Sequence, residues 1–107
     1  MSTPQRTDPF WISMRREKEF GTMADVYRVI ARDMGCPPPK PDRGQPCFGS
    51  YPPEEYAQLT VCDSLNLLAT ANHQLAHAYY ISCYDGPGHD CDQVVPQLEA
   101  RIGKFHK

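Results

Sequence analysis

The middle of this 107-residue sequence lacks both residues that commonly end a helix. No glycine and no proline occurs between Glu54 and Asp85, although the chain contains 7 glycines and 11 prolines. From Tyr56 onward in this stretch, Asp63 is the only formally charged residue. This uninterrupted segment predicts one continuous helix over about residues 53–84, roughly 45 Å long at a rise of about 1.5 Å per residue.

The shortage of charge excludes an ordinary surface helix, because such a helix carries Lys, Glu and Arg on the face that meets water. We therefore expect protein to cover most of its circumference. The predicted fold class is a small all-α helical bundle in a single domain, residues 1–107. It is built on the long central helix (about 53–84), with two short N-terminal helices, a Pro-rich connector and a short C-terminal helix.

The N-terminal part of the chain predicts two short helices. The first covers residues 8–20, where proline follows a capping aspartate, and ends at Gly21. The second begins at Thr22 and Asp25, which resemble a capping box, and continues to about Met34. Its apolar residues fall on one helical stripe that we expect to face the core: Met23, Val26, Tyr27, Ile30 and Met34.

Proline dominates the connector at residues 36–53, after Gly35 in a position that suits the end of a helix. Such a segment is typical of an extended, stiff spacer between helices. Residues 38–43 also match the pattern of a polyproline ligand, which leaves a recognition peptide as an alternative. Downstream, a turn at residues 85–88 precedes a last helix, which we expect from Asp92 to about Gly103.

The chain has no strong excess of charge of either sign. Its net charge is -2 and its pI about 6.0, so no global field attracts nucleic acid or an anionic membrane. The N-terminus shows no apolar signal segment, and polar residues within the central helix argue against a membrane span. We therefore expect a cytoplasmic protein whose cysteines are thiols or metal ligands rather than disulfides. These cysteines are Cys36, Cys47, Cys62, Cys83 and Cys91.

The central helix carries a heptad-like seam of mainly apolar residues and ends in a group of tyrosines. The seam is Val61, Leu65, Leu68, Asn72, Leu75 and Tyr79, and Tyr80 and Tyr84 extend its tyrosine-rich end. Small residues repeat beside it at Cys62, Ala69, Ala76 and Cys83. Because the helix is longer than its expected neighbours, we predict that these residues form an interface with a second copy or another protein.

A group of possible metal ligands follows in the sequence. His77, Cys83, His89 and Cys91 are the predicted ligands of a structural zinc site, against the alternative of ordinary polar residues. His73 also lies four residues before His77, the spacing at which two imidazoles share one face of a helix. Without the zinc alternative, no cofactor is expected.

The sequence lacks a recognisable catalytic constellation. Gln74 occupies the position at which a zinc protease has its glutamate base, and nothing in the sequence marks a pocket, an oxyanion donor or an orienting acid for a Cys83 nucleophile. We therefore predict no catalytic residues and no enzymatic activity.

The favoured function is a non-enzymatic protein–protein interaction module of adaptor or inhibitor type. It would act through the faces of the long helix and the tyrosine-rich end, and proteins of this size and type are common among those encoded by phages and mobile elements. Two alternatives are the structural zinc domain and a small-molecule binder with a pocket between protomers. A protein partner and self-association are expected, whereas membrane and nucleic-acid binding are not.

Overall fold

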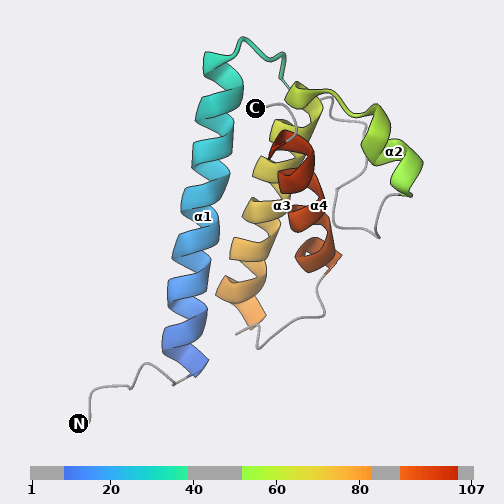
Figure 1. Cartoon of the computed structure of the whole chain (residues 1–107). Coiled ribbons are helices and arrows are strands. Elements are labelled where there is room, and N and C mark those ends of the chain that lie inside the picture. The colour runs from blue at the N-terminus through green and yellow to red at the C-terminus, as the bar shows by residue number, and fades with distance from the viewer. Residues whose placement is uncertain (1–8, 39–51, 83–89, 104–107) are drawn as a thin grey trace, which may run out of the picture.

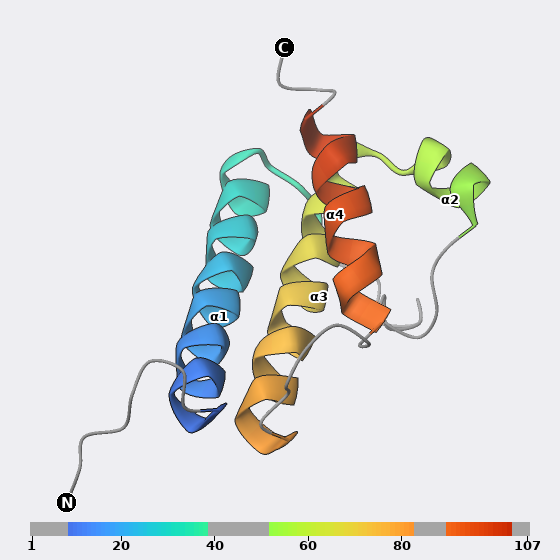
Figure 2. The ribbon, with the colours of Figure 1, turned by 60° about the horizontal axis from the view of Figure 1, so that its bottom comes forward.

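The computed structural model describes the backbone of residues 9–38, 52–82 and 90–103, and these residues form an all-α bundle without strands. The helices are α1 (Pro9–Asp33), α2 (Pro53–Gln58), α3 (Val61–Ser82) and α4 (Asp90–Gly103). Figures 1 and 2 show α3 between α1 and α4, with α1 and α3 running in opposite directions. The predicted all-α bundle is therefore confirmed, but two of its helix boundaries are wrong. The central part of the connector and the predicted turn at residues 85–88 lie outside the described residues.

The first correction concerns the N-terminus, where one helix of 25 residues replaces the two predicted short ones. Gly21 lies inside α1, and the Asp25 carboxylate pairs with Arg28 Nη1 at 3.1 Å instead of capping a helix start. A glycine in a helix costs only about 1 kcal/mol relative to alanine. Packing of α1 against α3 offsets that cost, because α1 and α3 make the most extensive contact between described elements.

The second correction concerns the long central helix, which is broken rather than continuous. The chain is extended at Leu59 (φ -69°, ψ 135°), which separates α2 from α3. Thr60 then begins α3 with a reciprocal capping box. Its Oγ1 accepts from the Asp63 N–H at 3.0 Å, and Asp63 Oδ2 accepts from the Thr60 N–H at 3.3 Å. Asp63 is thus a capping residue.

Arg101 of α4 fixes the corner between α2 and α3. Its Nη2 donates to the carbonyl oxygens of Ala57 and Leu59, both at 2.9 Å, and its Nε donates to Leu59 O at 3.3 Å. These carbonyls end the six-residue α2, where a positive charge complements the helix dipole. A guanidinium therefore holds a helix that is too short to be stable alone.

The end of α1 confirms the role predicted for Gly35. This glycine has φ +75°, the left-handed conformation that favours glycine. The Cys36 N–H donates to Ala31 O at 2.9 Å, and the Gly35 N–H donates to Arg32 O at 3.0 Å. This pair of hydrogen bonds is a Schellman motif, which turns the chain out of α1.

Two contacts hold α1 and α3 together near opposite ends of the antiparallel pair. Just beyond α1, Cys36 forms a disulfide with Cys62 in the first turn of α3, with a Cα–Cα distance of 5.4 Å. Near the other end, the rings of Phe20 and Tyr79 stack with their centroids 5.6 Å apart. Asn66 Nδ2 also donates to Pro37 O at 3.3 Å. The register of the pair is therefore set at both ends.

The core lies around α3. The buried side chains of α3 are Ser64, Leu65, Leu68, Ala69, Ala71, Asn72, Leu75 and Ala76. From α1, Ala24, Tyr27 and Ala31 are buried, and α4 contributes Cys91, Val94, Leu98 and Ile102. The alternation of leucine with alanine lets the helix backbones approach closely while large side chains fill the space between them.

The expectation of reduced cysteines is wrong for the described positions. Cys36 and Cys62 are bonded to each other, and Cys91 is also in a disulfide. The fully buried Cys91 Sγ lies 3.8 Å from Gln74 Oε1, which is a van der Waals contact because a disulfide sulfur carries no proton to donate. The odd number of cysteines, five, excludes complete pairing but leaves individual disulfides possible.

Candidate functional site

The most distinctive surface of the described chain is on α1. Met23, Val26 and Val29 are exposed there, with Val29 at 43% of its full accessibility. At about 3.6 residues per turn these side chains fall within about a third of the helix circumference. We call these three residues the α1 apolar surface. Met14 and Met34 add exposed thioether side chains near the two ends of the helix.

The arrangement of the helices explains why this surface is uncovered. Helix α1 packs against α3, and α4 packs against α3 and α2. Among the described elements, α1 and α4 make no close backbone contact, so α1 has one helical neighbour instead of two (Figure 2). The part of its circumference turned away from α3 therefore remains accessible.

The stripe that the sequence predicted to face the core includes two residues of this surface, Met23 and Val26, and the structure corrects that prediction. Met23, Val26 and Met34 are exposed, whereas Tyr27 is buried and Ile30 is half-buried. The true inner stripe is Phe20, Ala24, Tyr27 and Ala31, at successive steps of four, three and four residues. That spacing crosses Gly21 without interruption, and it was available as a signal for one continuous helix.

One long-range hydrogen bond links α1 to α4. The Tyr27 hydroxyl donates to Glu99 Oε2 at 2.9 Å, across a sequence separation of 72 residues. Burial of the ring, followed by this hydrogen bond and the negative charge of Glu99, raises the pKa of Tyr27 to about 12. No periodicity or motif in the sequence signals this pair, because the bond depends on how α4 is placed.

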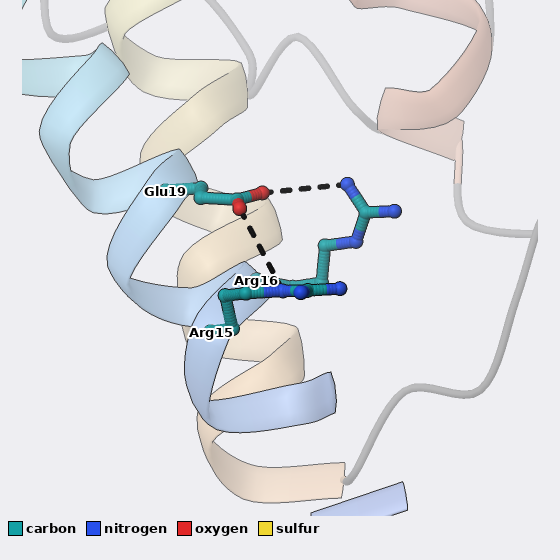
Figure 3. A network of polar contacts seen from close by, with 3 residues as sticks. All are labelled: Arg15, Arg16 and Glu19. Atoms are coloured by element: carbon teal, nitrogen blue, oxygen red, sulfur yellow. Dashed lines mark hydrogen bonds and ion pairs between the residues drawn. The ribbon is translucent and has the colours of Figure 1, made fainter. Parts of the chain in front are cut away.

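Charged residues occupy the N-terminal half of α1. Glu19 accepts a hydrogen bond from Arg16 Nη1 at 3.3 Å and lies 3.8 Å from Arg15 Nε (Figure 3). Exposed pairs of this kind contribute about 0.5 kcal/mol or less each. Burial raises the pKa of the nearby Tyr79, while the positive charge of Arg16 acts in the opposite direction. These internal pairs partly neutralise the basic side chains in this half of α1.

Most of the apolar seam predicted as an interface on the central helix is buried inside the single chain. Leu65, Leu68, Asn72 and Leu75 are buried within the single chain, so they are not available to a partner. Asn72 Nδ2 donates to Leu68 O at 2.8 Å, one turn earlier in the same helix. Val61 is half-buried and packs against the core.

The tyrosines at the end of α3 lie in different environments. Tyr79 is half-buried and stacks on Phe20, whereas Tyr80 is 70% exposed. Tyr84 lies outside the described residues. Of the predicted interface set, Tyr80 therefore offers the largest accessible aromatic surface among the residues described.

The predicted zinc ligands are only partly described. His77 is exposed on α3, Cys91 is buried in a disulfide, and Cys83 and His89 lie outside the described residues. A disulfide sulfur cannot supply the thiolate that zinc requires, so this set would need the Cys91 bond to be reduced. In the part of the chain that the structure describes, no three His, Cys, Asp or Glu side chains are placed to hold a metal ion together.

The protein was compared with protein-family models, curated proteins and solved structures, and none of them matches the chain. Within the described ranges, none of the helices combines the length and apolar character needed to cross a lipid bilayer.

Proposed function

We propose that this protein is a non-enzymatic protein–protein interaction module of adaptor or inhibitor type. The α1 apolar surface is the observation that carries the proposal. Three neighbouring apolar side chains lie accessible on a helix whose inner face is already buried against α3. Apolar residues gathered on one accessible helix face are typical of helix-mediated protein contacts.

The exposed side chains are of a kind that suits an interface. Methionine adapts its shape to different partners, and Met14, Met23 and Met34 are all exposed along α1. Tyr80 adds a rigid amphipathic ring near the opposite end of the α1–α3 pair from the Cys36–Cys62 bond. The proposed contact surface is therefore on α1 and not on the faces of the central helix that were predicted from the sequence.

Introducing negative charge into the α1 apolar surface tests this function. The double substitution Val26→Glu and Val29→Glu should abolish binding of a captured protein partner, because two charges would be buried at the contact. Gln93→Glu and Gln97→Glu on the exposed side of α4 form the matched control and should leave binding unchanged. Equal binding by both double variants would contradict the proposal, provided that circular dichroism shows both to be folded.

Self-association is the simplest form of this function. A second copy seated on the α1 apolar surface would give a mass in light scattering about twice the 12.1 kDa of the single chain. The Val26→Glu, Val29→Glu variant should then return to the monomer mass. A wild-type monomer at millimolar concentration would eliminate self-association and leave a different protein as the partner.

The disulfides are relevant to the cellular compartment in which the protein acts. The sequence favoured the cytoplasm, where thiols are normally kept reduced, whereas disulfides persist mainly in oxidising compartments. With Cys36, Cys62 and Cys91 in disulfides, we propose that the protein acts in an oxidising compartment. Thiol alkylation before lysis, followed by mass spectrometry, should find Cys36 and Cys62 unmodified. Alkylation of both in native cells would contradict this location.

A further inference from the structure

Two histidines share the exposed side of α3. His73 and His77 are both exposed and lie four residues apart in one continuous helix. On a helix this spacing places the Cβ atoms about 5–6 Å apart on the same face. Both imidazoles can therefore reach a single ion between them, as in helices that bind zinc through two histidines.

Core packing holds the backbone that carries this pair. Between and beside the histidines, Asn72, Leu75 and Ala76 are buried against the rest of the bundle. The helical conformation of residues 72–77 is thus fixed before any ion arrives. A metal ion would bind two ligands whose spacing is already set, which lowers the ordering cost of binding.

The charge of α3 does not oppose a cation at this pair. The helix contains no Lys and no Arg, and its single acidic residue, Asp63, is used in the capping box. No positive side chain on this helix repels a divalent ion bound at the pair.

We propose that His73 and His77 form a two-histidine binding site for a divalent transition-metal ion of the zinc type. Neutral imidazole is a preferred ligand of zinc, copper and nickel. Within the described residues no third side chain completes the set, so water or a group from a partner fills the remaining positions. This site shares His77 with the set predicted from the sequence, but it replaces the other three ligands and does not depend on the proposed function.

Calorimetric titration of zinc chloride into the full oxidised chain at about pH 7.5 tests the site, because neutral imidazoles are needed for binding. The wild type should bind one equivalent. His73→Gln and His77→Gln should each weaken binding at least about tenfold, because even the loss of a hydrogen bond to a metal ligand weakens metal sites by that factor. His89→Gln and His106→Gln should leave the affinity unchanged.

A relocated histidine provides the matched control. The variant His77→Gln with Gln93→His keeps the number of histidines but moves one to an exposed position of α4, and it should bind as weakly as His77→Gln alone. The proposal is overturned if zinc does not bind, if His73→Gln binds like the wild type, or if the relocated histidine restores binding. Loss of binding with His89→Gln but not with His73→Gln would instead support the set predicted from the sequence.

Discussion

At the scale of single residues, Gly21 is the clearest place where the chain is less stable than its fold allows. It lies inside α1, and a Cβ added there would meet no atom within 4 Å. Gly21→Ala should therefore raise the free energy of unfolding by about 0.5–1 kcal/mol, through lower entropy of the unfolded chain. Urea denaturation measures this change.

Gly35 provides the contrasting substitution. It also has open space around it, but its φ of +75° disfavours any residue with a Cβ. Gly35→Ala should lower the free energy of unfolding by about 1 kcal/mol, because alanine is strained in the left-handed region. The opposite result for the first variant, a lower free energy of unfolding in Gly21→Ala, would mean that α1 does not continue through position 21.

Tyr27 should make stability depend on pH in the alkaline range. Its pKa is raised to about 12 in the folded protein, so the folded state retains a proton that the unfolded state loses above about pH 10. The stabilisation is fully present below about pH 10 and is lost as the pH rises toward 12. The urea midpoint should fall more between about pH 9 and pH 11.5 in the wild type than in Tyr27→Phe.

A control separates the negative charge of Glu99 from the burial of the Tyr27 ring. Glu99→Gln keeps an acceptor for the Tyr27 hydroxyl but removes the negative charge. It should therefore reduce the alkaline loss of stability only in part, because burial is the largest cause of the raised pKa. Identical alkaline profiles for the wild type and Tyr27→Phe would contradict the burial of this hydroxyl between α1 and α4.

At the scale of elements, two similar sequence patterns have opposite outcomes. Thr22 with Asp25 and Thr60 with Asp63 both match a capping box, but only the second pair caps a helix. The difference lies in tertiary packing. Helix α1 packs into the core on both sides of Thr22, through the half-buried Phe20 and the buried Ala24, whereas the chain at Leu59 turns so that α2 contacts α4. Local sequence could therefore not decide which pattern begins a helix.

Other elements could be predicted because local chemistry determines them. Gly35 followed by prolines ends α1 wherever α1 packs, and acidic residues begin α4 at Asp90, two residues before the predicted cap. The exposed face of α1 could not be predicted in the same way. Its apolar residues are as periodic as core residues, and only the position of α4 shows which of them remain uncovered.

Arg101 should control the stability of the α2–α3 corner. Arg101→Met removes the charged hydrogen bonds to Ala57 O and Leu59 O and should cost about 1.5–3 kcal/mol of unfolding free energy. Arg101→Lys keeps the charge without the planar guanidinium, so its free energy of unfolding should lie between those of the wild type and Arg101→Met. Hydrogen exchange at the Leu59 amide, which donates to Tyr56 O, reports the corner directly. Unchanged exchange in Arg101→Met would contradict this role.

At the scale of the whole molecule, the Cys36–Cys62 bond connects the ends of a 26-residue span and restricts the unfolded chain. Loop-closure entropy for a loop of that length corresponds to about 3.5 kcal/mol. The double variant Cys36→Ala, Cys62→Ala should therefore lose about 3 kcal/mol of stability in urea without reductant. A loss below about 1 kcal/mol would show that the bond is not a main constraint on the α1–α3 pair.

If the accessible side of α1 contacts another protein, site-specific photo-cross-linking in native cells will capture that contact. A photoreactive residue at Val29 should give a covalent adduct with a second protein chain, which mass spectrometry then identifies as another copy or a different partner. The same residue at the exposed Gln97 of α4 should give none. Adducts at Gln97 alone, or at neither position, would contradict a protein contact on the accessible side of α1.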